Sequence, residues 1–383
     1  MKCGLCLPLC PTYAQTRNEA DSPRGRISLV QGWVNGDLAM TSKLAGHLDS
    51  CLTCRACETG CPSLVTFGRI MDGAKARRVA SLSRWRRALN QTWIAALSNP
   101  RINANLGRFA RSYAHSALAR LARWLRLDRH PRLSPFLRLT GAIAVNARTF
   151  IPETRESSDI ELFVGCSGET AQGGAIAAAM EVFERLGIRA DLPGTASCCG
   201  AMLRHNGFSD AAQSHRNARI EAGSNRPLVG LSSACIAELR ESPEPADAWE
   251  ICDYLDRQSW PEALQLHPLQ ARVLVHEPCS HRNLLGGNAS VHHLLARIPE
   301  LELAPMPENH RCCGAAGTYL LQQPEMAAAL LADKLDPALA AAPDIIVTTN
   351  SGCALHLLAG VQEAGRSVEV IHPVELLARQ MPS

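Results

Sequence analysis

Seven cysteines near the N-terminus have types and spacing that suit metal binding. Four form the run CLTCRACETGCP, and three stand in MKCGLCLPLCP: Cys51, Cys54, Cys57 and Cys61, and Cys3, Cys6 and Cys10. The four-cysteine run fits C-x2-C-x2-C-x3-C-P, in which thiolates, as soft charged ligands, surround iron–sulfur clusters. Zinc also takes four cysteines, but usually as two separated C-x2-C pairs. The spacing therefore favours iron–sulfur clusters over zinc.

In two-cluster ferredoxins the fourth cysteine of such a run binds the other cluster. By this crossover rule one site is complete and consists of Cys10, Cys51, Cys54 and Cys57. The other site lacks one ligand and consists of Cys3, Cys6 and Cys61. Its missing cysteine would stand one residue before Met1. We expect that the natural chain starts upstream; the alternative is a [3Fe–4S] or labile cluster at this site.

A second group of cysteines forms a duplicated pattern in the C-terminal half. Each copy has one cysteine, then an adjacent pair followed by glycine, then a last cysteine, with matching positions 113 to 118 residues apart. The copies are Cys166, Cys198, Cys199 and Cys235, and Cys279, Cys312, Cys313 and Cys353. Adjacent cysteines are poorly placed to form a disulfide with each other, but they can bind two irons of one cluster. Single buried cysteines are common in cores, and Cys252 is expected to be one; duplication of the whole spacing favours two further metal sites.

The elements that must position these cysteines differ along the chain. We expect residues 1–74 to form a helical two-cluster ferredoxin-like domain. Residues 75–158 should form a basic connector with helices over 84–97 and 109–127. From residue 159, strand-like runs (ELFVGC, PLVGLSS, ARVLVHE, DIIVTTN) alternate with helical ones, which is typical of α/β layers.

The first and last cysteines of each copy directly follow strand candidates, so they should meet at one edge of a sheet. The expected fold class is α+β multidomain, with a duplicated α/β cysteine-rich domain over 159–270 and 271–383.

Composition and charge indicate where the protein is located and what it contacts. With 46% hydrophobic residues the chain should be well cored. No signal peptide precedes Cys3 and no apolar run reaches about 18 residues, so clustered cysteines point to a cytoplasmic location. Between Lys75 and Arg148 stand sixteen basic residues and one acid. Such an imbalance calls for an anionic neighbour.

The basic segment also has an amphipathic pattern. Arginines alternate with apolar and aromatic residues: Arg108, Arg111, Arg120, Arg123 and Arg126 among Phe109, Tyr113, Leu118, Leu121, Trp124 and Leu125. This pattern favours peripheral contact with the inner face of the cytoplasmic membrane, or with an acidic partner subunit, over a plain solvated face. Nucleic-acid binding is disfavoured because no nucleic-acid motif accompanies the charge.

The sequence gives weaker evidence of function for the polar residues beside the cysteines. Arg24 and Arg26 could offset cluster charge or meet a partner, although a solvated loop is equally compatible with the sequence. His47 could donate to a cluster sulfur. Four histidines lie near the CCG cysteines, and a structural role is expected for most of them: His276, His281, His310 and His356.

Several of these motifs together resemble the iron–sulfur subunit family of bacterial glycolate oxidase. The matching text is CGLCLPLCPTY, DSPRGRISL, HLDSCLTCRACETGCPS, VGCSG, SCCGA, EPCSH, RCCGAAGTY and VTTNSGC. The chain is similar as well to iron–sulfur subunits of lactate oxidation systems and of anaerobic glycerol-3-phosphate dehydrogenase. Its C-terminal half resembles the cysteine-rich domain pair of heterodisulfide reductase, in which each domain can hold a non-cubane cluster. Ser232 and Asn350 replace the first cysteine of the reductase's final C-x2-C pairs, which puts cluster type and occupancy in question.

This resemblance implies two [4Fe–4S] clusters, further clusters in the cysteine-rich domains, and a separate FAD-binding subunit that oxidises a 2-hydroxy acid. Glycolate is the expected substrate and D-lactate the next; a quinone-type carrier would be the acceptor. No Gly-rich dinucleotide fingerprint occurs, since GCSGETAQGG has the wrong spacing. No catalytic residue is assigned. The alternatives are a heterodisulfide-reductase-like thiol/disulfide site, a lactate or glycerol-3-phosphate dehydrogenase subunit, and a zinc-stabilised or redox-sensing binding module.

Overall fold

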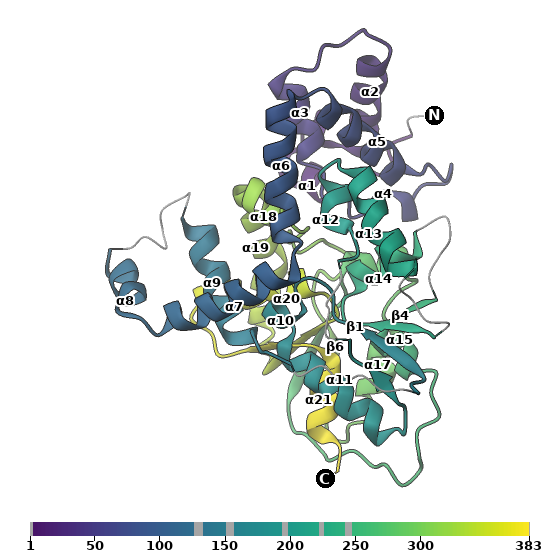
Figure 1. The fold of residues 1–383 in the computed structure, drawn as a ribbon, viewed down its shortest axis with the longest axis vertical. Coiled ribbons are helices and arrows are strands. Elements are labelled where there is room, and N and C mark those ends of the chain that lie inside the picture. The colour runs from purple at the N-terminus through teal and green to yellow at the C-terminus, as the bar shows by residue number, and fades with distance from the viewer. Residues whose placement is uncertain are drawn as a thin grey trace.

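The structure is a computed structural model that describes residues 3–125, 133–150, 157–193, 198–221, 226–241 and 247–382. Its N-terminal region, purple in Figure 1, is helical. The elements are α1 (Pro11–Thr16), the 3-10 helix η1 (Glu19–Asp21), α2 (Pro23–Val34), α3 (Ser42–Asp49), α4 (Ala56–Thr59) and α5 (Phe67–Ala80). Ser22 begins α2, because its Oγ accepts from the backbone N–H of Gly25 and Pro23 supplies a preset φ at the first helical position.

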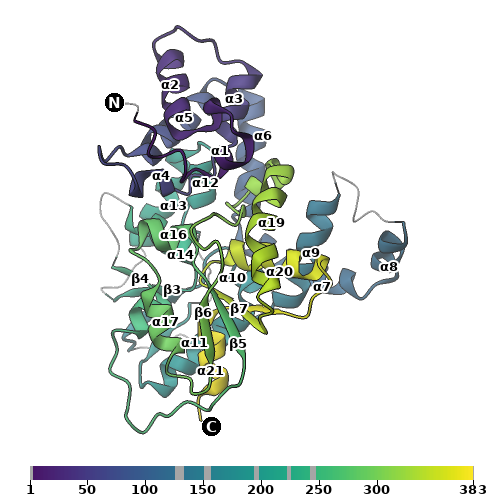
Figure 2. The same cartoon turned by 180° about the vertical axis from the view of Figure 1, so that it is seen from behind.

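The basic connector is also helical. It comprises α6 (Arg84–Leu97), α7 (Pro100–Ala114), α8 (Ala117–Trp124) and α9 (Ser134–Asn146). The single helix expected over 109–127 is wrong in its middle, since the chain leaves the helix between Ala114 and Ala117. Ser116 causes the new start: its Oγ accepts from the backbone N–H of Ala119, which satisfies a donor of the first turn of α8. In Figures 1 and 2, α8 stands away from the rest of the molecule, whereas α9 packs against α7 and against α20 (Ser351–Glu363).

Two parallel four-stranded sheets follow, in the same strand order. The first has the order β2-β1-β3-β4, from β1 (Ile160–Phe163), β2 (Ala190–Asp191), β3 (Leu228–Gly230) and β4 (Ala248–Glu250). The second has the order β6-β5-β7-β8, from β5 (Arg272–His276), β6 (Glu302–Pro305), β7 (Ile345–Thr348) and β8 (Glu369–Ile371). The expected α+β class is confirmed, and all four strand candidates are central strands. The edge strands were not predicted, because their sequences AD, AWE, ELAP and EVI mix polar and apolar residues and form no apolar run.

Helices connect the strands of each sheet. The first set is α10 (Gly168–Ala171), α11 (Gly173–Arg185), α12 (Ala201–His205), α13 (Ser209–Glu221), α14 (Ser233–Arg240) and α15 (Ile251–Leu255). The second set is α16 (Cys279–Leu284), α17 (Ala289–Leu295), α18 (Tyr319–Gln322), α19 (Pro324–Ala340), α20 (Ser351–Glu363) and α21 (Pro373–Gln380). We call the two sheets with their helices lobe 1 and lobe 2.

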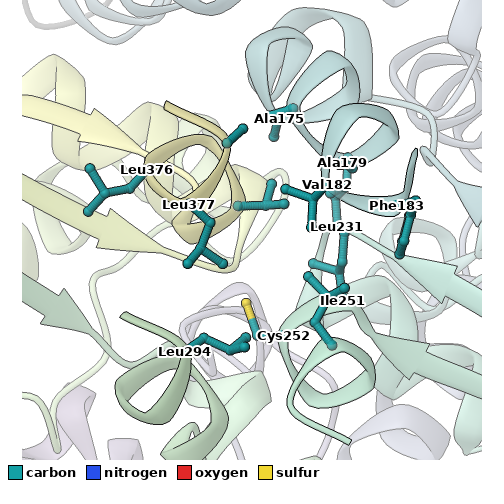
Figure 3. Packing of buried hydrophobic residues seen from close by; sticks show 14 of the residues in the cluster. Ala175, Ala179, Val182, Phe183, Leu231, Ile251, Cys252, Leu294, Leu376 and Leu377 are labelled. Carbon is teal, nitrogen blue, oxygen red and sulfur yellow. The ribbon is translucent and has the colours of Figure 1, made fainter. Parts of the chain in front are cut away.

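The largest core cluster joins the two lobes (Figure 3). The C-terminal helix α21 lies beside α11 of lobe 1. Leu376 and Leu377 of α21 belong to the same buried cluster as Ala175, Ala179 and Val182 of α11. Cys252 lies in the same cluster and is fully buried, as a small core residue should be. The lobes therefore share apolar surface, which fixes the edges of their sheets relative to each other.

His372 holds this junction from the start of α21. Its Nδ1 accepts from the backbone N–H of Val374, and Glu375 accepts from the backbone N–H of His372, which makes a capping box. The other ring nitrogen, Nε2, donates to the carbonyl oxygen of Leu231 in lobe 1 at 3.1 Å.

Candidate metal centres

The four cysteines of the complete N-terminal set line one cavity. Cys10 reaches it from the start of α1, and the other three come from the loop before α4 and its first turn: Cys51, Cys54 and Cys57. About 310 Å³ of space, partly open to solvent, lies between them and their neighbours. Thr53 and Arg55 have left-handed φ angles of 52° and 59°, which curl this loop around the cavity.

The remaining N-terminal cysteines lie nearer the surface. Cys3 is exposed, whereas Cys6 and Cys61 are partly buried. Burial raises the pKa of Cys6, and the nearby sulfurs of Cys10 and Cys3 add to the rise. Cys61 approaches the same loop through Gly60, where a Cβ would lie only 2.3 Å from Leu9 Cδ1. The grouping of Cys3, Cys6 and Cys61 as a second set stays a prediction.

The cysteines of lobe 1 meet at the carboxyl ends of the adjacent central strands β1 and β3. Cys166 follows β1, Cys235 lies in α14 after β3, and the pair Cys198–Cys199 precedes α12. The thiols contact one another in the order Cys166, Cys198, Cys199, Cys235. The hydrogen bond with Cys198 raises the pKa of Cys166, whereas the same bond, received from Cys166, lowers the pKa of Cys198.

Lobe 2 repeats this arrangement at the ends of β5 and β7. The thiols contact one another in the order Cys279, Cys312, Cys313, Cys353. The Sγ atoms of Cys313 and Cys353 are 2.9 Å apart. The hydrogen bond with Cys312 and then burial raise the pKa of Cys279. Both duplicated sets of the sequence are therefore brought together.

A glycine after each adjacent cysteine pair lets the chain approach a helix closely. Gly200 and Gly314 have φ angles of 89° and 87°. A Cβ would lie 2.7 Å from the carbonyl oxygen of Ala212 at Gly200, and 2.8 Å from that of Ala327 at Gly314. The backbone N–H of each glycine also points at the first sulfur of its pair, at 3.4 Å from Cys198 and 3.5 Å from Cys312. Only glycine fits this conformation and this contact without strain.

These donor sets fit iron–sulfur clusters. All sixteen cysteines have free thiols. Within each lobe, burial and neighbouring sulfurs raise the pKa of most thiols, so four thiolates cannot coexist there without a positive partner. An iron cluster supplies that charge and favours the thiolate form.

Two buried lysines lie beside the cysteine loops. Lys75 Nζ donates to the carbonyl oxygen of Cys51 at 3.3 Å. Lys334 is fully buried, and its Nζ donates to the carbonyl oxygens of Glu308, Asn309 and Arg311 just before Cys312. Burial lowers the pKa of both lysines. They place positive charge near the thiolates and hold the loops that bear them.

The polar residues predicted near the N-terminal motifs have defined partners. Arg26 is buried and lines the cavity, and it donates to Thr12 Oγ1, Ser50 Oγ and the carbonyl oxygen of His47. Arg24 pairs with Glu19 at 2.7 Å. His47 Nδ1 lies 2.8 Å from Asp21 Oδ1, so that nitrogen is engaged by a carboxylate.

The histidines of the lobes differ in environment. His276 is buried beside Cys313 and Cys353. His281 is buried between Thr349 and Asp253, whereas His310 is exposed next to Glu308. His356 bonds the carbonyl oxygen of Ala327. The structural role expected for most of them holds for His281 and His356, and His276 is the one that faces cysteines.

Sequence reasoning missed the contact between the N-terminal cavity and lobe 2. Asn283 of α16 donates to the carbonyl oxygen of Cys54 at 2.7 Å, and Tyr319 donates its hydroxyl to the carbonyl oxygen of Ser50 at 3.0 Å. Leu52 packs with Cys312 and Tyr319, and Cys54 and Cys279 border the same apolar cluster. No local pattern signals this contact, because its two sides are more than two hundred residues apart in the chain.

The connector exposes an unusual share of apolar surface. Its exposed residues include Trp85 (64%), Phe109 (62%), Leu118 (66%) and Trp124 (77%). Arg108, Arg111 and Arg120 belong to the same helices; Arg126 and the side chain of Arg123 lie outside the described residues. In the part of the chain that the structure describes, no helix is both long and apolar enough to cross a membrane.

Comparison with known protein families agrees with this arrangement. Residues 1–65 match the 4Fe-4S dicluster domain, and residues 160–240 and 273–358 each match the cysteine-rich (CCG) domain. The chain is thus an iron–sulfur protein in which one dicluster domain precedes a duplicated cysteine-rich domain.

Curated relatives make this class more specific. The chain is 29% identical to the glycolate oxidase iron-sulfur subunit of Escherichia coli (strain K12), over 99% of this chain and 93% of that protein. It is 26% identical to the probable glycolate oxidase iron-sulfur subunit of Bacillus subtilis (strain 168), over 98% and 92%. Lactate utilization protein A of an Exiguobacterium strain is 23% identical over 57% of this chain and 96% of that protein. The chain is therefore a homologue of glycolate oxidase iron–sulfur subunits.

Proposed function

We propose that this chain is the electron-transfer subunit of a flavin-linked 2-hydroxy-acid dehydrogenase whose substrate is glycolate, with D-lactate as the next candidate. The observation that carries the proposal is the adjacency of cysteine sets: the cavity of Cys10, Cys51, Cys54 and Cys57 abuts Cys279 and Cys312 of lobe 2. The relatives named as glycolate oxidase iron–sulfur subunits support the choice of substrate.

In this proposal the ligands are the cysteines of the four sets expected from the sequence. One [4Fe–4S] cluster would be held by Cys10, Cys51, Cys54 and Cys57, and the second N-terminal cluster by Cys3, Cys6 and Cys61. Each lobe would hold a further cluster on its four cysteines. When bound, such clusters supply one-electron carriers, which suit a partner flavin that gives up two electrons.

The residues of the chain prepare these sites. Apolar neighbours exclude water, the buried lysines Lys75 and Lys334 offset thiolate charge, and the glycines after the cysteine pairs allow close backbone approach. A separate FAD-binding subunit would provide the flavin and the substrate site, and a quinone-type carrier would be the acceptor.

The test is anaerobic reduction of the reconstituted complex. With its FAD-binding partner subunit, the chain should give reduced-cluster EPR signals on addition of glycolate, weaker ones with D-lactate, and none with glycerol 3-phosphate. The isolated chain should have no disulfide reductase activity. Reduction by glycerol 3-phosphate alone, disulfide reductase activity of the isolated chain, or stoichiometric zinc without a reducible signal would each overturn the proposal.

We further propose that the connector binds the anionic inner face of the cytoplasmic membrane peripherally. Exposed Trp85, Phe109, Leu118 and Trp124 accompany the arginines of the same helices, which is the composition of helices that lie in a membrane interface. Flotation of the intact protein should require vesicles that contain anionic lipid and should weaken as salt rises. A variant with Trp85, Phe109 and Trp124 changed to Ser should not float, and wild-type protein that ignores anionic vesicles would contradict the proposal.

A further inference from the structure

His276 brings a nitrogen donor into the cysteine set of lobe 2. One ring nitrogen of His276 and the Sγ atoms of Cys313 and Cys353 all lie within 4.8 Å of one another. All three side chains are buried, with at most 4% of the residue surface exposed. A neutral imidazole is a good ligand for iron, so this group has the composition of a mixed nitrogen–sulfur site.

The ring of His276 is held by a neighbouring strand. His276 is the last residue of β5 and pairs in register with Thr348, the last residue of β7. Nδ1 of His276 lies 2.8 Å from Thr348 Oγ1. Metal-binding histidines commonly have one ring nitrogen held in this way, which fixes the ring and leaves the other nitrogen for the metal. Here Thr348 holds Nδ1, so Nε2 is left to act as a ligand.

The internal repeat supplies a built-in comparison. His276 stands three residues before Cys279, and in lobe 1 the position three residues before Cys166 is Phe163, the last residue of β1. Phe163 is buried against Cys199, as His276 is beside Cys313. An apolar ring therefore occupies in lobe 1 the place of an imidazole in lobe 2. If this position only filled space in the core, a phenylalanine such as Phe163 would be sufficient in both lobes. We take the imidazole of His276 to indicate that lobe 2 binds its group differently from lobe 1.

The other candidate for a fifth ligand in lobe 2 is already engaged. Asn350 begins α20, and its Oδ1 accepts from the backbone N–H groups of Gly352 and Cys353. Its Nδ2 donates to Ser280 Oγ at 3.3 Å. Both ends of this amide are used by the protein, so the oxygen does not substitute for a thiolate.

We propose that His276 is the fifth protein ligand of an iron–sulfur cluster in lobe 2, beside Cys279, Cys312, Cys313 and Cys353, whereas lobe 1 holds an all-cysteine site. The inference rests on the proposed function, in which the lobes hold clusters. Replacing a charged thiolate by a neutral imidazole makes a cluster easier to reduce, as the histidine-ligated Rieske centres illustrate. Exchange of His276 for cysteine should therefore lower the reduction potential of the lobe 2 cluster.

The test is pulsed EPR of the intact, anaerobically purified protein with and without ¹⁵N-labelled histidine. The lobe 2 signal is identified as the one that the variant Cys353→Ser removes. That signal should have a strong ¹⁴N coupling that changes to a ¹⁵N pattern on histidine labelling. His276→Gln should abolish the coupling, whereas the control His356→Gln, which changes a buried histidine of the same lobe, should retain it.

A conservative exchange tests the ligand role separately from packing. In His276→Cys a thiolate replaces the imidazole, so iron content should stay the same while the midpoint potential of the lobe 2 signal falls. The labelling experiment on the wild-type protein decides the question even where a variant fails to fold.

The possible failures are distinguishable. A lobe 2 signal without histidine nitrogen coupling overturns the role of His276 but leaves the cluster in place. If Cys353→Ser changes neither iron content nor any EPR signal, lobe 2 holds no cluster, and both this inference and that part of the proposed function are wrong.

Discussion

Asn283 Nδ2 donates a hydrogen bond to the carbonyl oxygen of Cys54, 2.7 Å away. This bond joins the ligand loop of the N-terminal cavity to α16, the helix that begins at Cys279. Two cysteine sets from opposite ends of the chain are thereby held as neighbours. Leu52 and Cys54, which line the cavity, also border the apolar cluster that contains Cys312 of lobe 2.

Asn283→Ala should loosen the contact between the Cys54 loop and α16 without removing iron. A single hydrogen bond contributes about 1 kcal/mol net, so the chain should still fold while the loop of Cys54 gains freedom. We expect the magnetic interaction between the two reduced clusters to fall, as measured by EPR power saturation. The control is Asn103→Ala, because Asn103 bonds only carbonyl oxygens of the connector. Identical saturation in both variants would contradict the expectation.

Gly200→Ala should remove the iron bound in lobe 1, and Gly314→Ala should remove the iron bound in lobe 2. A left-handed conformation costs a residue with a Cβ roughly 1–2 kcal/mol, and the carbonyl contacts of 2.7 and 2.8 Å add to this cost. Iron and sulfide analysis should show a loss confined to the lobe concerned. Gly187→Ala and Gly286→Ala are matched controls, since both positions have positive φ but no atom within 4 Å of the added Cβ. Equal iron loss in the controls would mean that backbone strain alone matters.

Arg204→Met should loosen the N-terminal domain from lobe 1. Its guanidinium lies 2.6 Å from Asp72 of α5, 2.5 Å from Glu238 of α14 and 2.8 Å from Glu241, the residue after α14. Breaking a buried ion pair by removing one partner costs about 3–5 kcal/mol. The lower end of this range is expected here, because Glu238 keeps Arg216 and Glu241 keeps Arg55, and only Asp72 loses the ion-pair partner that the structure describes.

Anaerobic urea unfolding should therefore show a large loss for Arg204→Met. The comparison is Arg189→Met, because the ion pair of Arg189 with Asp159 is exposed to solvent, which screens it, so its loss should change the stability little. If both variants lose the same small amount, the pairs of Arg204 do not stabilise the docked domain.

The acid sensitivity of the lobe junction should depend on His372. Burial lowers the pKa of His372 to about 3, whereas in the unfolded chain it is near 6.5. Below pH 6.5 the unfolded state therefore takes up a proton that the folded state does not. The contribution of this residue is fully present above pH 6.5 and is lost as pH falls toward 3, at up to about 1.4 kcal/mol per pH unit.

His372→Asn retains an acceptor for the start of α21 and removes this titration. The free energy of unfolding of the variant should fall less steeply between pH 6 and 4 than that of the wild type. The difference between the two slopes should be at most about 1.4 kcal/mol per pH unit. Burial raises the pKa of the adjacent Glu250 to about 7, but Glu250 is present in both proteins, so its effect is shared. Parallel pH profiles would contradict the prediction.

Local chemistry made the candidate sites readable from the sequence. The ligands of the complete N-terminal set lie mostly within one short loop, so their spacing alone indicates the metal class. The same is true of the adjacent pairs Cys198–Cys199 and Cys312–Cys313, whose following glycines mark a left-handed turn. The central strands were also predicted, because strands buried on both faces leave a continuous apolar run. The helices α11 and α19 were predicted from apolar residues at helical spacing.

Other features depend on packing between distant segments. The break between α7 and α8 depends on a single serine cap, and the edge strands are held by their neighbours rather than by their own residues. By itself the sequence determined which cysteines form sets, since those constraints act over a few residues or repeat along the chain. Only the tertiary structure decided that Cys54 meets lobe 2 and that His276, rather than Asn350, faces the cysteines there. These contacts follow from strand register and shared apolar surface, which bring together residues that no local pattern connects.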